Sequence, residues 1–148
     1  GDLGVCIAAD ESAHTDEDAK NKIEQGYGAI AVKAVAKTLS MTMKIAQMAY
    51  EENIPCFCAD LTVNPILVDW NKNVAARLQP FPGMKIGLLE SNGHQYYKNW
   101  DQMMSYHPRS GASWEQAKNG LYPLDKEFYE ESGGVLISPP HYMEMFEK

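Results

Sequence analysis

The sequence predicts an α/β fold with a parallel sheet, and two observations lead to this prediction. Short apolar runs alternate with stretches whose apolar residues recur at helical spacing, and the runs end near positions 9, 32, 59 and 89. Each strand and helix together therefore take roughly 25–30 residues, which is typical of the βα units of a parallel sheet. The composition agrees, because 45% of the 148 residues are hydrophobic and 22% are charged, as in an ordinary globular protein.

Four segments are predicted to be strands. Each is short, mainly apolar and followed by polar or turn-forming residues, which is the pattern of a strand buried in a parallel sheet. In chain order these segments are residues 5–9, 29–32, 55–59 and 85–89.

Helices are predicted between these strands. Thr15 can cap a helix to about residue 25, because its hydroxyl can accept a free backbone N–H and acidic residues follow it. Ser40 can cap the next helix, and Asn64 with Pro65 has the pattern of an N-cap and first helical position. That third helix is expected to extend to about residue 78, where prolines follow.

Four βα units are half of an eight-stranded barrel, which typically takes about 250 residues. We therefore expect residues 1–105 to form the C-terminal half of a TIM-type (β/α) barrel. The remainder, residues 106–148, is rich in glycine, proline and aromatic residues. After a short helix near residues 100–106, we expect an irregular tail that packs on the barrel or on a capping region.

The charge and the apolar runs bear on the expected partners and location. The formal net charge of −7 argues against a nucleic-acid partner, which would favour basic patches. No apolar run approaches the roughly 20 residues that span a bilayer, so no membrane partner is expected. Cys6, Cys56 and Cys58 do not form an obvious disulfide framework, which favours a reducing cytoplasm. Cys56 and Cys58 lack a second Cys or His pair, so packing is favoured over zinc binding.

The strongest functional signal lies where the first two predicted strands end. Asp10 and Glu11 follow the first strand, and Lys33 follows the second. The carboxyl ends of parallel barrel strands meet at one rim, so these groups should lie close together. A carboxylate there can bind a divalent cation, and a lysine beside a cation can serve as a base because its ammonium form is disfavoured. The pattern predicts removal of a proton next to a carboxylate.

These residues resemble the enolase superfamily, and within it the mandelate racemase / muconate lactonizing enzyme group. The matching motifs are Ala9-Asp10-Glu11-Ser12, Val32-Lys33 and Leu89-Glu90-Ser91, and the resemblance extends from about residue 5 to residue 100. In that group such motifs end the fifth, sixth and eighth strands of the barrel. The resemblance therefore implies that the chain corresponds to strands five to eight, with the capping domain and two further metal ligands preceding it.

The resemblance also implies roles for single residues. It makes Asp10 the third ligand of Mg²⁺ or Mn²⁺, Lys33 the base, and Glu90 a hydrogen-bonding partner or acid for the developing enolate. Asp60 ends the third strand, and two roles are equally favoured for it: substrate contact and structural hydrogen bonding. Asn92, just past Glu90, can contact the substrate and set specificity.

The implied reaction acts on a small carboxylate substrate and is racemisation or epimerisation, dehydration, or cycloisomerisation. The full-length enzyme is expected to be a homo-oligomer. Two alternatives stay open at this point. Lys33 could instead form a Schiff base in a barrel aldolase, or the chain could be a non-catalytic half-barrel that serves as an interaction module.

Overall fold

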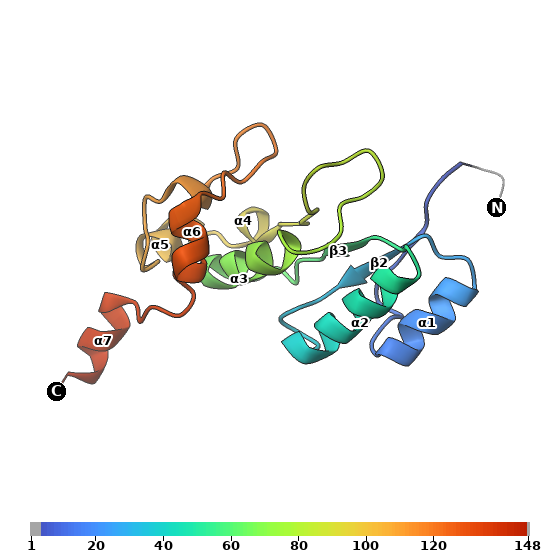
Figure 1. The fold of residues 1–148 in the computed structure, drawn as a ribbon. Helices are drawn as coiled ribbons and strands as arrows, with labels where there is room; N and C mark the ends of the chain where they lie inside the picture. Colours follow the sequence, from blue (N-terminus) through green and yellow to red (C-terminus); the bar gives the residue numbers. More distant parts are fainter. Residues whose placement is uncertain (1–3, 148) are drawn as a thin grey trace.

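A computed structural model describes residues 4–147 (Figure 1). Its N-terminal part contains three parallel strands that are neighbours in chain order. Ala8 pairs with Ala29, and Ile30 pairs with Cys56. The predicted α/β class with a parallel sheet is therefore confirmed, although the strands at the two sides are shorter than expected. The strands are β1 (Ala8–Ala9), β2 (Ala29–Val32) and β3 (Cys56–Cys58).

Helices α1 and α2 connect these strands, as parallel pairing requires. Thr15 caps α1 (Asp16–Glu24) with a reciprocal pair of bonds: its hydroxyl accepts the Asp18 N–H at 3.1 Å, and its N–H donates to the Asp18 carboxylate at 3.0 Å. The predicted cap is therefore confirmed. The two helices pack against each other, and α2 (Leu39–Glu51) also covers β2.

The predicted cap of α2 is wrong by two positions. The helix begins at Leu39, and the hydroxyl of Thr38 accepts the Met41 N–H at 3.3 Å. Ser40 lies inside the first turn, with its hydroxyl 3.1 Å from that of Thr38. Both residues have side chains that cap helices well, so their types could not decide between them.

Helix α3 (Pro65–Ala75) follows β3 and begins as predicted. The Asn64 side chain accepts the Leu67 N–H at 3.1 Å, and Pro65 occupies the first turn, where its missing N–H costs nothing. The helix ends earlier than residue 78. Several of its residues are buried although they are polar or charged, which shows that it packs on two sides.

The predicted fourth strand, residues 85–89, is wrong in extent. Leu89 forms a single parallel bridge with Cys58. A Cβ atom on Gly87 would lie 1.8 Å from the Ala75 carbonyl oxygen, so the backbone there packs against the end of α3 instead of extending the sheet. The sheet formed by residues 4–147 thus has three strands extended by this one bridge, in place of four full βα units.

The core is formed by the sheet together with α1, α2 and α3. Every residue of β2 is buried, as expected for the central strand of a parallel sheet covered by helices. The burial of Cys56 and Cys58 raises the pKa of each thiol to about 12, so both behave as small apolar residues, as predicted. The core side chains come from both strands and helices and include Ala9, Ala19, Ile30, Val32, Ile45, Ala49, Cys56, Cys58 and Ala75.

The tail is more ordered than the predicted irregular segment. The expected short helix is present as α5 (Trp100–Ser105), which packs on α3 together with η2 (Ser132–Gly134). Helix α6 (Lys126–Glu131) packs on η2. Asp125 caps α6 by accepting the Phe128 N–H at 3.0 Å. An aspartate is a common N-cap residue, but the prediction of an irregular tail followed the glycine-rich composition instead. Helix α7 extends away from the other elements at the C-terminal end (Figure 1). The remaining elements are α4 (Gly93–Tyr96), η1 (Ser113–Glu115) and α7 (Pro140–Phe146).

None of the helices formed by residues 4–147 combines the length and apolar character needed to cross a membrane.

The open side of β1 leads to a prediction about association. β1 lies at one edge of the sheet, and the chain leading into it exposes Val5 and Ile7 at 71% and 62%. Unpaired apolar edges promote association, so we expect the 148-residue chain to self-associate in light scattering. Lysine at positions 5 and 7 should reduce this association more than Leu136→Lys, which changes an exposed residue away from that edge. A monodisperse monomer with a cooperative melt would contradict the prediction.

Candidate functional site

Asp10, Glu11 and Lys33 converge at the carboxyl end of the sheet. Asp10 directly follows β1, and Lys33 directly follows β2, so parallel pairing brings both to the same edge. The Lys33 Nζ lies 2.9 Å from Asp10 Oδ1 and also donates to the Glu11 carboxylate. Lys33 is 5% exposed, whereas both carboxylates reach solvent. The structure therefore joins three residues that the sequence placed at two strand ends.

The surroundings of Lys33 favour its ammonium form. Burial lowers the pKa of Lys33, but hydrogen bonds and charge from Glu11 and Asp10 outweigh this effect, and the net pKa is raised. Lys33 thus carries a proton at neutral pH in this arrangement. Lys33 can act as a base only when less negative charge faces its Nζ than in this arrangement.

Lys37, four residues later, occupies a different environment. Its Nζ donates to the Ala13 carbonyl at 2.6 Å, which ties the turn after β2 to the turn after β1. Burial lowers the pKa of Lys37, and the nearby Lys33 charge lowers it further. Lys37 is therefore a tether between two loops, and it provides a natural comparison for Lys33.

Asp10 has the character of one metal ligand. Its Oδ1 is buried and has no hydrogen-bond partner besides the ion pair with Lys33. A carboxylate oxygen is the ligand type that Mg²⁺ and Mn²⁺ prefer. Residues 4–147 contain no group of three His, Cys, Asp or Glu side chains arranged to hold a metal ion. Asp10 thus presents one buried carboxylate oxygen beside the Lys33 ammonium.

Asp60 joins the loop after β3 to the segment after Leu89. One carboxylate oxygen accepts the Val63 N–H at 3.1 Å, and the other accepts the N–H groups of Asn92 and Gly93 at 2.7 and 3.2 Å. The side chain is buried, and three backbone donors occupy it. Of the two roles considered for Asp60, structural hydrogen bonding is the one it performs here.

Glu90 and Asn92 lie at the same edge, just past the bridge between Leu89 and Cys58. The Asn92 side-chain amide donates to Glu90 Oε1 at 3.3 Å. Glu90 is exposed, so its carboxylate is accessible to a ligand at the carboxyl end of the sheet. The candidate site is thus a row of polar groups along this edge, in the order Asp10, Lys33, Asp60 and Glu90.

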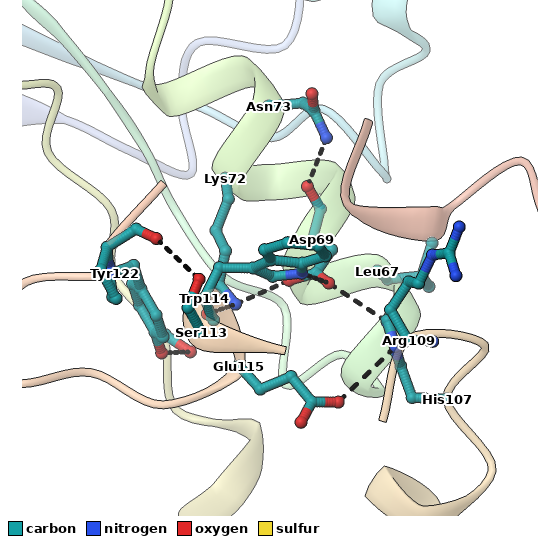
Figure 2. Close-up of polar contacts among 12 residues, drawn as sticks. Leu67, Asp69, Lys72, Asn73, His107, Arg109, Ser113, Trp114, Glu115 and Tyr122 are labelled. Atoms are coloured by element: carbon teal, nitrogen blue, oxygen red, sulfur yellow. Dashed lines mark hydrogen bonds and ion pairs between the residues drawn. The ribbon is translucent and has the colours of Figure 1, made fainter. Parts of the chain in front are cut away.

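A second polar group, absent from the sequence-based predictions, lies between α3 and the tail (Figure 2). Asp69 accepts from Lys72 at 2.6 Å and from the Trp114 indole at 3.1 Å, and it lies 3.1 Å from His107 Nε2. Glu115 lies beyond His107. We call Asp69, Lys72, His107, Trp114 and Glu115 the Asp69 cluster.

The Asp69 cluster is almost completely enclosed. Asp69, Lys72 and His107 are each at most 5% exposed. Lys72 also donates to the Trp114 carbonyl at 2.8 Å and lies 4.0 Å from the centre of the Tyr122 ring. A signal for this cluster existed in the sequence, because charged residues at positions 69 and 72 interrupt the apolar spacing of α3. Their partners come from residues about 40 positions later, so spacing alone could not find them.

Comparisons with known proteins found no match for this chain: no family model, no curated protein and no solved structure is similar to it.

The hydrogen bonds of Asp60 lead to a stability prediction. Replacing Asp60 by alanine removes the acceptor of three backbone N–H groups, two of them buried, and should cost about 1–3 kcal/mol of unfolding free energy. Urea unfolding measures this loss. Glu90→Ala is the matched control, because that exposed carboxylate accepts only from Asn92 and its removal should cost much less. Equal losses in the two variants would show that Asp60 does not hold these loops together.

Proposed function

We propose that this chain is the C-terminal part of a (β/α) barrel enzyme of the enolase-superfamily type, which moves the proton next to a carboxylate on a small substrate. One observation carries the proposal: a buried lysine meets a carboxylate at the carboxyl ends of two adjacent parallel strands. Acid–base chemistry in barrel enzymes is located at this end of the strands. The motifs at Asp10, Lys33 and Glu90 support the same assignment by resemblance.

In the proposed enzyme, Asp10 supplies one oxygen to a bound Mg²⁺ or Mn²⁺, together with ligands from preceding strands. The ion would supply positive charge beside the substrate carboxylate, which favours loss of the neighbouring proton. The chemistry of Asp10 suits this role, because its buried Oδ1 has spare capacity for a further positive partner.

Lys33 is the group that moves the proton. When Asp10 is engaged by a cation, Lys33 loses part of the negative charge that favours its ammonium form. Neutral Lys33 Nζ can then accept the substrate proton, and the C–H electron pair stays on the substrate. The resulting ammonium can return the proton, which gives exchange or racemisation. Glu11 stays as the nearby counter-charge for that ammonium.

Glu90 and Asn92 are proposed to contact the substrate from the other end of the row. Their mutual hydrogen bond orients the exposed Glu90 carboxylate, and the bonds from the Asn92 and Gly93 N–H groups to Asp60 fix the backbone that carries Asn92. A rigid support of this kind keeps a binding group in place at low entropic cost. The substrate, its stereochemistry and the later steps depend on groups contributed by other parts of the enzyme.

Lys33→Ala in the enzyme that contains this chain should abolish exchange of the substrate's alpha proton. General-base catalysis typically contributes about 10²–10⁴-fold, so exchange into deuterated water followed by NMR should fall by about that factor. Lys37→Ala is the matched control and should retain exchange, because that lysine donates to a backbone carbonyl. Undiminished exchange in the Lys33 variant would remove it from the reaction. A borohydride-trapped adduct on Lys33 would favour the aldolase alternative.

Asp10→Asn should weaken divalent-metal binding, because it replaces a charged oxygen ligand by a neutral amide. Calorimetric titration with Mg²⁺ measures the change, and the comparison is Asp16→Asn, an acid on the surface of α1. Equal Mg²⁺ affinity in wild type and the Asp10 variant would show that Asp10 is not a ligand.

A further inference from the structure

An apolar groove lies between helices α2 and α3, with a volume of about 410 Å³. The apolar side chains that line it recur every three or four positions, so each helix contributes one continuous stripe. These side chains include Leu39, Met43 and Ala46 of α2, together with Trp70, Val74 and Leu78 of α3 and the turn after it. At 1.5 Å per residue, the stripe on α2 is about 10 Å long, which is two helical turns.

Helix α7 has an apolar side that matches this groove. It extends away from the other elements, and its Met145 and Phe146 are 66% and 82% exposed (Figure 1). Tyr142 and Met143 are exposed as well. At 3.6 residues per turn these four side chains share one side of the helix, and Glu144 lies on the opposite side. A helix of this length is marginal in water by itself, so α7 needs a surface that covers its apolar side.

We propose that this chain forms a dimer in which each copy places α7 in the groove between α2 and α3 of the other copy. Helix α7 is about 10 Å long, so its length fits the groove. Placing an apolar helix face in an apolar groove is a common mode of recognition, with anchor side chains at helical spacing. Two reciprocal insertions form a closed twofold arrangement, in which both grooves and both copies of α7 are covered.

Charge gives the direction of α7 in the groove. Arg77 lines the groove at the same end as Ala46, and it is exposed. Its Nη1 donates to the Asn73 carbonyl at 2.7 Å, and a guanidinium carries further N–H donors on its other nitrogens. Glu147 directly follows α7, at the end where the last helical carbonyls carry partial negative charge. Opposite charges therefore meet when this end of α7 lies at Arg77.

The linker before α7 favours a second copy over the chain's own groove. Val135 lines the groove, and four residues separate it from α7. Ser138 and Pro139 each precede a proline, which favours extended backbone, and Pro139 is extended at φ −63° and ψ 132°. The His141 ring stacks on Tyr106 with 4.1 Å between the ring centres, which holds the first turn of α7. A reversal into the same groove would have to break this stack and bend the linker.

Disulfide formation between two kinds of chain tests the proposal. Both carry Cys6→Ser, which removes the exposed native thiol, and lysine at positions 5 and 7, which suppresses association through β1. One kind adds Met43→Cys in the groove, and the other adds Met143→Cys on α7. Cys56 and Cys58 stay unreactive, because burial raises the pKa of each thiol to about 12. After mild oxidation of the mixture, we expect a disulfide that joins the two kinds of chain.

The control places the first cysteine away from the groove. Lys126→Cys, at an exposed position of α6, replaces Met43→Cys and should not link to Met143→Cys. Equal linking of the groove and control cysteines would overturn the proposal. A single chain that carries both Met43→Cys and Met143→Cys shows which copy supplies the helix. A disulfide within that one chain would place α7 in its own groove and would also overturn the proposal.

Light scattering gives a second readout in chains without added cysteines. With lysine at positions 5 and 7, we expect twice the mass of one chain. Phe146→Asp puts a charge on the apolar side of α7 and should give the mass of a monomer, whereas Glu144→Gln, on the opposite side, should leave the dimer intact. Arg77→Glu should weaken the dimer severalfold, and Glu147→Arg in the same chain should restore it. The same mass in the Phe146 and Glu144 variants would contradict docking through this side of α7.

Discussion

Parallel pairing of β1, β2 and β3 is the constraint on which the rest of the molecule depends. Parallel strands need a crossover between them, and α1 and α2 supply it while covering the buried β2. The same pairing sends all carboxyl ends to one edge. Residues separated by more than 20 positions in the chain, such as Asp10 and Lys33, therefore meet there as an ion pair.

Helix α3 links this sheet to the tail, and it does so with two unlike surfaces. One side packs on β3 through apolar residues such as Ala75. The other side carries Asp69 and Lys72, which form an ion pair with each other and hydrogen-bond to Trp114 of the tail, with His107 beside Asp69. Buried charges are costly unless each is paired and hydrogen-bonded, so the Asp69 cluster favours one particular docking of the tail on α3.

The buried lysines Lys33 and Lys72 differ in the groups that surround their ammonium ends. Lys33 contacts two carboxylates that reach solvent, as the proposed proton transfer requires. Burial lowers the pKa of Lys72 although Asp69 opposes this effect, and its ammonium contacts Asp69, the Trp114 carbonyl and the Tyr122 ring. A group with exchangeable partners suits proton transfer, whereas an enclosed group suits the positioning of α3 and the tail.

The sequence by itself determined the parallel α/β class, the caps Thr15 and Asn64, and the meeting of Asp10 with Lys33, because these depend on local capping and on strand ends. Three further features were decided only by the tertiary structure: the extent of the fourth strand, the partners of Asp60 and the Asp69 cluster. Residues 85–89 read as a strand, yet the close approach of Gly87 to Ala75 limits them to one bridge. The hydrogen bonds that Asp60 accepts from Asn92 and Gly93 join segments that lie more than 30 positions apart in the chain. The Asp69 cluster was invisible to spacing, because its members are neighbours only after the tail folds back on α3, and a single sequence carries no record of such long-range contacts.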